Sequence, residues 1–330
     1  MIYFKKHENS SINSKQNFNK YFIYFFKFLL FFFLLIIFFI LKNNKSSLSS
    51  HSYFSCFISS AKLENRYIRE LIEYYKKLGI NKFYIGDNNS INDERLSDVL
   101  KDYISKGYIE IIDIRGKNIS QDYFFLYTFD LYKSKCKWMI YFDIDEYLEF
   151  VNKSKTINEY LSEDRFKKCE VIKINWLMFN DNNLIYYDNR TLQERFTEPN
   201  YYKNDIRTVK SIVRGNCTRN PWINHPGPHE PSKGLKSCNS IGQFSSYNGG
   251  KIYPPVFKYC YIKHYSIKST EEFGYKIKNG YYGGRKFNIE NRVNYYFKVN
   301  KFSEEKLSLL EKLFNKTFPW FHKRKKLIKK

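Results

Sequence analysis

The sequence predicts an α/β fold: a mostly parallel sheet with helices on both faces, preceded by a single transmembrane helix. Between residues 53 and 150, short apolar segments alternate with amphipathic segments, a pattern typical of parallel strands joined by crossover helices. Ahead of them, residues 21–41 form an apolar run with one charge, Lys27. With 330 residues, 43% of them hydrophobic, the chain is long enough for one main domain with a sizeable core.

The first elements follow from hydrophobic periodicity. We expect a strand at 52–61, followed by a helix at 64–78 whose apolar side chains recur on one face and which ends at Gly79. A second strand is expected at 82–85 and a second helix at 95–104.

The next elements complete the alternation. We expect a third strand at 108–114 and a helix at 121–132. KWMIYF at 137–142 is an almost continuous apolar run, typical of a strand buried on both faces. Beyond residue 150 the alternation weakens, and we expect only a strand at 170–175 and a terminal helix at 303–314.

The apolar run at 21–41 is expected to be an uncleaved membrane anchor. It is long enough to cross a hydrocarbon core of about 30 Å as a helix. Four lysines precede it and two follow it closely, which predicts a cytoplasmic N-terminus. The alternative is a cleaved signal peptide, but no small-residue cleavage site follows closely. We therefore expect a single-pass type II membrane protein whose main domain lies in the ER or Golgi lumen or otherwise outside the cytoplasm.

This prediction divides the chain into five parts. They are a basic cytoplasmic tail (1–20), the signal-anchor (21–41), a short stem (42–52), the main domain (53–300), and a C-terminal helix with a basic tail (301–330). The formal net charge is +23, and about half of it lies at the anchor flanks and in the last eight residues. The rest gives a moderately basic body, which suits phosphate-bearing ligands, polyanions or anionic membranes alike.

The six cysteines are an even number and could pair in an oxidising lumen. None is spaced as CxxC, so a zinc site is not expected. Cys217 and Cys238 lie in a loop-like stretch and are our first candidates for a disulfide. Cys136 and Cys169 flank strand-like runs and are equally candidates for buried thiols.

Acidic residues follow the expected strand at 137–142. Asp143 and Asp145 are two positions apart, so in an extended segment both carboxylates point the same way. Ligands of parallel sheets bind at the carboxyl ends of strands, and two hard oxygen donors suit Mg²⁺ or Mn²⁺ held together with substrate phosphates. The alternative is a solvated turn that caps the next helix. Because unpaired buried carboxylates are costly, we favour the metal.

Four segments, in order, resemble glycosyltransferase family 92 and related family 2-like enzymes over about residues 55–285. They are residues 64–93, WMIYFDIDEYLEF (138–150), INWLMF (174–179) and KHYSIKSTEEFGYKIKNG (263–280). The resemblance implies a GT-A-like (Rossmann-like) fold. It also implies a metal-dependent enzyme that transfers a sugar from a nucleotide-sugar donor, most often a UDP-sugar, to a glycan or glycoprotein acceptor. Together with the expected anchor, this predicts a membrane-anchored glycosyltransferase.

The resemblance implies roles for individual residues. Asp145 is expected to bind Mn²⁺ (or Mg²⁺) directly, Asp143 to contact the metal or the ribose, and His264 to complete the coordination sphere. Asp87 is expected to contact the donor nucleoside. The other candidate donor-binding residues are Glu64, Gln121 and Lys276, of which Lys276 is placed to touch the diphosphate.

A carboxylate base for the acceptor hydroxyl is expected in the loop-rich half of the chain. Asp181 and Glu230 are our candidates, and Asp181 is preferred. One position departs from the family pattern: Leu63 stands where relatives usually have Asn. If that Asn contacts the base, donor affinity or identity differs here.

Two other classes of function remain open. The Leu63 departure leaves room for an inactive, membrane-anchored protein of the same fold that binds glycans. The net charge alone would also allow a basic nucleic-acid-binding protein, but the anchor and the acidic cluster argue against it. We therefore expect no nucleic-acid partner.

Overall fold

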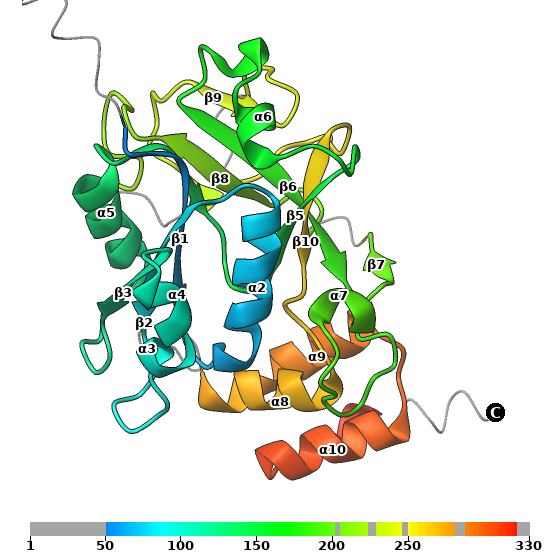
Figure 1. The fold of residues 1–330 in the computed structure, drawn as a ribbon. Coiled ribbons are helices and arrows are strands. Elements are labelled where there is room, and N and C mark those ends of the chain that lie inside the picture. Colours follow the sequence, from blue (N-terminus) through cyan, green and yellow to red (C-terminus); the bar gives the residue numbers. More distant parts are fainter. Residues whose placement is uncertain (1–50, 202–204, 224–228, 246–249, 281–287, 322–330) are drawn as a thin grey trace, which may run out of the picture. The chain divides into compact units, whose positions relative to one another are not determined.

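The structure is a computed structural model that describes residues 51–201, 205–223, 229–245, 250–280 and 288–321 (Figure 1). The predicted cytoplasmic tail, the predicted anchor, most of the stem and the basic tail lie outside these residues. Within the described ranges, no helix is long and apolar enough to cross a membrane.

The first eight elements confirm the predicted alternation of strands and helices. Only the helix expected at 95–104 differs: it is divided in two at Leu100, whose backbone leaves the helical region (φ −114°, ψ 14°). The elements are β1 (Tyr53–Ala61), α2 (Asn65–Lys77), β2 (Lys82–Asp87), α3 (Leu96–Val99), α4 (Lys101–Ser105), β3 (Ile109–Asp113), α5 (Gln121–Tyr132) and β4 (Cys136–Tyr141).

These elements form a parallel half-sheet with helices on both faces. The strand order is β3-β2-β1-β4, and all neighbours are parallel. Side chains alternate along β1: Phe57 packs into the core that includes residues of α2, whereas Cys56 and Ile58 pack into the core that includes residues of α5. Because the strands are parallel, their carboxyl ends meet at one edge of the sheet.

The second half of the sheet contains both parallel and antiparallel neighbours. The prediction of a mostly parallel sheet is therefore wrong for this half. β8 is antiparallel to both β4 and β6, β10 is parallel to β6, and β5 is antiparallel to β10. Antiparallel neighbours need no crossover helix, and this half has few helices (Figure 1). Its elements are β5 (Glu146–Phe150), α6 (Ile157–Leu161), the 3₁₀ turn η1 (Asp164–Phe166), β6 (Val171–Phe179), α7 (Leu192–Arg195), β7 (Pro199–Asn200), β8 (Val209–Arg214), β9 (Ser237–Asn239) and β10 (Cys260–His264).

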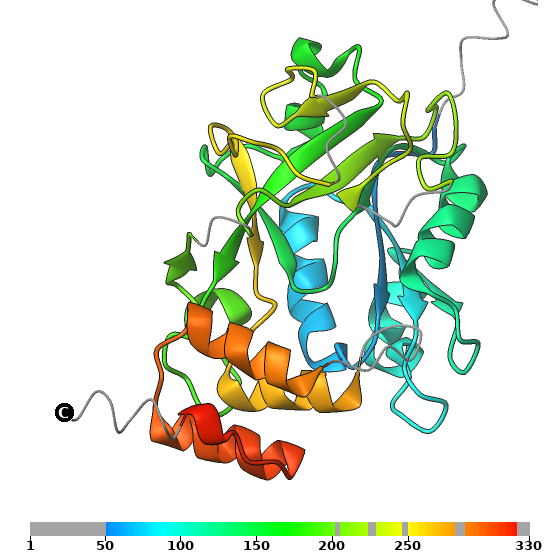
Figure 2. The same cartoon turned by 180° about the vertical axis from the view of Figure 1, so that it is seen from behind.

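Three C-terminal helices pack together: α8 (Thr270–Asn279), α9 (Ile289–Val299) and α10 (Glu304–Phe314) (Figure 2). They share an apolar cluster that includes Phe273, Val293, Tyr296 and Leu310. The predicted terminal helix is confirmed as α10, and the Ser303 side chain accepts a hydrogen bond from the Lys306 backbone to cap it. The domain boundary expected between residues 300 and 301 therefore falls within one shared core.

Among the described residues, two disulfides cross-link parts of the sheet region. Cys56 and Cys136 join β1 to β4, and Cys169 and Cys238 join the chain before β6 to β9. The expected Cys217–Cys238 pair is wrong, because β9 pairs with β6 and thereby brings Cys238 to Cys169. Cys136 and Cys169 are disulfide-bonded and not thiols, whereas Cys217 is free.

Candidate functional site

A cavity of about 680 Å³ lies at the carboxyl-end edge of the sheet. Its wall is built by the segment that runs from the end of β1 into α2, the segment that runs from β2 to α3, the start of α5, the turn after β4, and the segment that runs from the end of β10 into α8. Six of the predicted site residues line this one cavity: Glu64, Gln121, Asp143, Asp145, His264 and Lys276. Segments far apart in the sequence thus converge at the edge where parallel strands end.

The Asp143 carboxylate is held by two side chains. Gln121, the first residue of α5, donates from Nε2 to Oδ1 at 2.7 Å. Lys210, a fully buried residue of β8, donates from Nζ to Oδ2 at 2.7 Å. Burial alone would raise the pKa of Asp143, but the Lys210 ammonium outweighs it and holds the pKa below its usual value. Asp143 is therefore a fixed, ionised carboxylate.

The Asp145 carboxylate divides its oxygens between lysines and an imidazole. Lys276 donates from Nζ to Oδ2 at 2.8 Å, and Lys268 Nζ lies 3.6 Å from the same oxygen. His264 Nε2 lies 3.4 Å from Oδ1. Burial opposes ionisation, yet Lys276, Lys268 and His264 together hold the pKa of Asp145 well below its usual range. Both lysines contact Oδ2, so Oδ1 can bind another cation.

Glu146, the third acid after β4, shapes the turn. Its Oε2 accepts a hydrogen bond from the Asp143 backbone at 2.9 Å, and its Oε1 lies 3.5 Å from Lys210 Nζ. The side chain is fully buried, and burial raises its pKa well above the usual range although Lys210 opposes this. Of the three acids, only Asp143 and Asp145 line the cavity.

Asp145 and His264 fit a divalent cation as two protein ligands, with the remaining ligands supplied by oxygens of the bound substrate. Asp145 Oδ1 and His264 Nε2 are 3.4 Å apart, which is long for a hydrogen bond, and a carboxylate and a neutral imidazole are both ligands that Mn²⁺ accepts. His264 Nδ1 is buried and has no hydrogen-bond partner among the described residues. The predicted trio of ligands is not assembled: in the described part of the chain, no three His, Cys, Asp or Glu side chains form a metal site. Asp143 is held by Gln121 and Lys210 instead.

Asp87 is buried and does not line the cavity. Its Oδ1 accepts from the Asn89 backbone at 3.1 Å, and its Oδ2 accepts from the Leu96 backbone at 2.9 Å. Asn89 in turn accepts from the Leu63 backbone at 2.8 Å. Asp87 thus supports the segment that forms the wall, and these contacts give no evidence for the nucleoside contact expected of it.

Neither candidate base lies at this cavity. Asp181 is buried, where Tyr296 donates to its Oδ2 at 2.5 Å and Lys306 Nζ lies 2.6 Å from the same oxygen. Glu230 is also not among the lining residues; its charge acts on Lys173 of β6. Asp181 thus contacts α9 and α10 in this structure, and an acceptor base at Asp181 or Glu230 stays a prediction.

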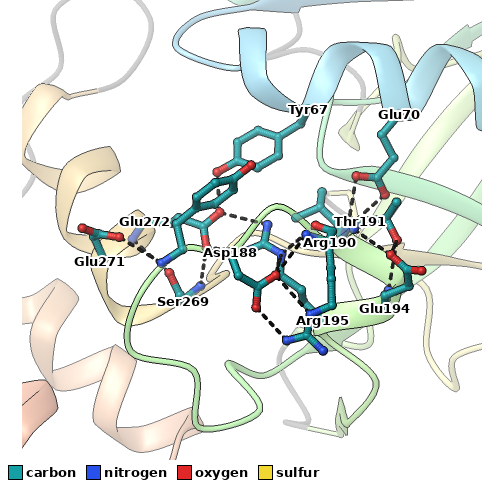
Figure 3. Close-up of polar contacts among 12 residues, drawn as sticks. Tyr67, Glu70, Asp188, Arg190, Thr191, Glu194, Arg195, Ser269, Glu271 and Glu272 are labelled. Carbon is teal, nitrogen blue, oxygen red and sulfur yellow. Dashed lines mark hydrogen bonds and ion pairs between the residues drawn. The ribbon is translucent and has the colours of Figure 1, made fainter.

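A buried polar network joins two residues of the cavity wall, Tyr67 and Glu272, to Arg195 (Figure 3). Arg195 of α7 donates to both oxygens of Glu272, at 2.7 and 3.1 Å, and Tyr67 of α2 also donates to Glu272. Glu272 Oε2 accepts from the Ser269 backbone at 3.1 Å, and the Ser269 side chain caps α8. One glutamate thus fixes the start of α8 to two other helices.

Sequence reasoning missed three of the residues that organise this site. Lys268 and Glu272 belong to the segment 263–280 that carries part of the resemblance. The resemblance could therefore have pointed to them, but no role was predicted for either residue. Lys210 carries no such signal, because its contact with Asp143 depends on the pairing of β8 between β4 and β6.

Comparisons with known proteins agree with the sequence prediction of a family. The family described as Glycosyltransferase family 92 matches residues 55–249. Glycosyltransferase family 92 protein Os08g0121900 of Oryza sativa subsp. japonica is 30% identical over 95 residues, which are 29% of this chain and 16% of that protein. The match therefore spans about a sixth of the length of this curated relative.

Solved structures show weaker likeness. S. aureus TarS 1-349 is 13% identical with a TM-score of 0.35, and the match covers 79% of this chain and 71% of that one. An active-site mutant of LgtC is 13% identical with a TM-score of 0.30, covering 76% of this chain and 98% of that one. Scores of this size do not establish a shared fold.

Proposed function

Because the chain belongs to glycosyltransferase family 92, we propose that it transfers a sugar from a nucleotide-sugar donor, a UDP-sugar, to a glycan or glycoprotein acceptor on a GT-A type fold. The observation that carries the proposal is the pair Asp143 and Asp145 at the end of β4, ionised in one cavity beside His264, Lys268 and Lys276. Carboxylates can bind a divalent ion, and neighbouring cationic side chains can bind the diphosphate of the donor.

The residues divide the work of the transfer. The acceptor hydroxyl bonds to the anomeric carbon and loses its proton to a base or to water, while the bond between the sugar and the diphosphate breaks and negative charge develops on the leaving diphosphate. Lys276, on the wall of the cavity, is placed to offset this charge. Gln121 and Lys210 hold Asp143 in one orientation, so it would contact the donor without rearranging.

Asp145 and His264 would hold Mn²⁺ or Mg²⁺ through Oδ1 and Nε2. When bound, the cation supplies Lewis-acid stabilisation of the diphosphate. Lys276 donates a hydrogen bond to Asp145 Oδ2, and this orients the carboxylate so that Oδ1 faces His264.

We also propose that residues 21–41 anchor the enzyme as a type II membrane protein whose catalytic domain faces the ER or Golgi lumen or another extracytoplasmic space. The two disulfides among the described residues support this compartment, since disulfides persist in oxidising environments. Protease treatment of sealed membrane vesicles would test it: the catalytic domain should be protected, and digestion without detergent would refute it.

A donor assay with the full chain in detergent tests the transfer. Nucleotide-sugars are supplied with glycan acceptors and Mn²⁺, and release of the nucleoside diphosphate is measured. Asp145→Asn should lower turnover at least about 100-fold, as loss of a transition-state contact does. Asp164→Asn, at an acid whose side chain is 85% exposed, is the matched control and should leave turnover unchanged. Turnover by Asp145→Asn equal to wild type would overturn the assignment.

A further inference from the structure

Two residues of the cavity wall adopt an unusual backbone conformation. Among the described residues, six that are not glycine have a positive φ, and four of these are Asn, which tolerates this region. The other two are Leu63 (φ 59°) and Lys268 (φ 62°), and both line the cavity. Strained backbone of this kind persists only where surrounding contacts enforce it, and it clusters at functional sites.

The Lys268 ammonium is buried yet only loosely bound. The residue is 3% exposed. Its Nζ lies 3.3 and 3.5 Å from the two Glu64 oxygens and 3.6 Å from Asp145 Oδ2, and it lies 4.4 Å from the centre of the Tyr67 ring. A strong bond between an ammonium and a carboxylate is about 2.7–2.9 Å, as Lys276 makes to Asp145. An ammonium with three donors and only long contacts retains capacity for another anion.

The network of Figure 3 explains how the strain is maintained. Lys268 immediately precedes Ser269, the residue that caps α8, and Glu272 closes this cap by accepting from the Ser269 backbone. Arg195 and Tyr67 hold Glu272 in place. The backbone of Lys268 is therefore fixed by contacts to α2 and α7, and its side chain is directed into the cavity.

From this arrangement we infer that Lys268 is a specificity residue that binds the second phosphate of a nucleoside diphosphate, moving from its long contacts with Glu64 and Asp145 onto a phosphate oxygen. The inference rests on the proposed function, because the ligand is the diphosphate of the donor. Lys268 selects a nucleoside diphosphate over the corresponding monophosphate.

The ratio of two dissociation constants tests this. The full chain in detergent is titrated in a calorimeter with UDP and UMP, GDP and GMP, and CDP and CMP, first with EDTA and then with Mn²⁺. For the base that binds, Lys268→Met should weaken the diphosphate at least about 10-fold and the monophosphate less than about twofold, because only the diphosphate reaches Lys268. Lys268→Arg, which keeps the charge, should stay within about threefold of wild type for both. Lys278→Gln, at an exposed lysine of α8, the helix that follows Lys268, should change neither.

A second variant tests the inference even if Lys268→Met does not fold. Glu64→Gln keeps Lys268 and removes one carboxylate that competes for it, so it should increase the preference for the diphosphate about threefold or more. If both Lys268→Met and Glu64→Gln keep the wild-type preference for the diphosphate over the monophosphate, the role of Lys268 is overturned. If Lys268→Met does not fold, an unchanged preference in Glu64→Gln alone overturns it. Failure of the wild-type chain to bind any of the three diphosphates with Mn²⁺ would instead overturn the proposed function, and this inference with it.

Discussion

Arg195 and Glu272, 77 residues apart, form a buried ion pair with two hydrogen bonds of 2.7 and 3.1 Å. Their side chains are 1% and 4% exposed, so both charges have lost their hydration. Such a pair is stable only when geometry and further hydrogen bonds compensate for this loss. Here Tyr67 and the Ser269 backbone also donate to Glu272, which makes the pair the junction of α2, α7 and α8.

Arg195→Met should strongly destabilise the fold. It leaves Glu272 buried without its counter-ion, and breaking a buried pair in this way costs about 3–5 kcal/mol. Urea unfolding measures the change. Arg190→Met is the control, because Arg190 pairs with Asp188 at the surface and its loss should have no measurable effect. Equal stability of the two variants would contradict the role of the pair.

Stability should also depend on the protonation of Glu272. Burial would raise its pKa, but Arg195, Ser269 and Tyr67 hold it below the usual value. Since the folded pKa lies below the unfolded value of about 4.3, this contribution is complete above that value and is lost as the pH falls through the folded pKa. Urea unfolding from pH 6 to pH 3 should therefore show a steeper loss for wild type than for Glu272→Gln. If the stability of wild type and of Glu272→Gln fell equally with pH, ionised Glu272 would not contribute to stability in this way.

The backbone at position 63 gives a structural reason for the Asn that the family pattern has there. Leu63 has a φ of 59°, and Asn is among the few residues that adopt this region readily. The Asn that relatives carry here therefore need not contact the base.

Leu63→Asn should stabilise the chain by about 1 kcal/mol, because it relieves the left-handed strain. Thermal unfolding measures the gain. Leu63→Ala removes the same side chain without relieving the strain, so it serves as the control and should not stabilise. If Ala and Asn stabilise equally, the benefit comes from removing an exposed leucine and not from the backbone.

The two disulfides give a prediction that peptide mapping can check directly. Under non-reducing conditions, Cys56 should be linked to Cys136 and Cys169 to Cys238, while Cys217 reacts with a thiol reagent after unfolding. The double variant Cys56→Ala/Cys136→Ala should lose about 2–5 kcal/mol of stability, because the unfolded chain regains the freedom of a long loop. A Cys217–Cys238 linkage would contradict the structure.

The sequence predicted the N-terminal half of the sheet well because its signals are local. Alternation along β1 and the apolar face of α2 are each contained in one segment, and parallel order follows from strands that alternate with helices. The second half depends on partners that are remote in sequence: β10 pairs with both β5 and β6. No local periodicity specifies these pairings, so the mixed sheet was missed.

The same distinction applies to the site. Asp143 and Asp145 were recognisable because they follow a buried strand, and His264 because it belongs to a segment that carries the resemblance. The contact between Lys210 and Asp143 arises from the antiparallel register of β8 against β4, which sets Ser211 opposite Tyr141. Asp181 was chosen for its place in a loop-rich region, and position in the chain alone did not reveal that α9 and α10 enclose it.

The burial of Asp181 separates a structural role from a catalytic one. Its Oδ2 receives the Tyr296 hydroxyl and the buried Lys306 ammonium, so Asp181→Asn would leave Lys306 without a counter-ion. We expect a loss of about 3–5 kcal/mol in unfolding free energy, whereas kcat per folded molecule should stay within about threefold of wild type, because this carboxylate does not line the cavity. Lys306→Met removes the other partner and should destabilise the chain by a similar amount.

The two measurements must be made on the same preparation, with the folded fraction determined at the temperature of the assay. Glu198→Gln, at an exposed acid of the same region, is the control and should change neither quantity. If Asp181→Asn abolished turnover while its unfolding curve matched that of wild type, Asp181 would be the acceptor base after all. That result would require α9 and α10 to move so that Asp181 could reach the acceptor hydroxyl.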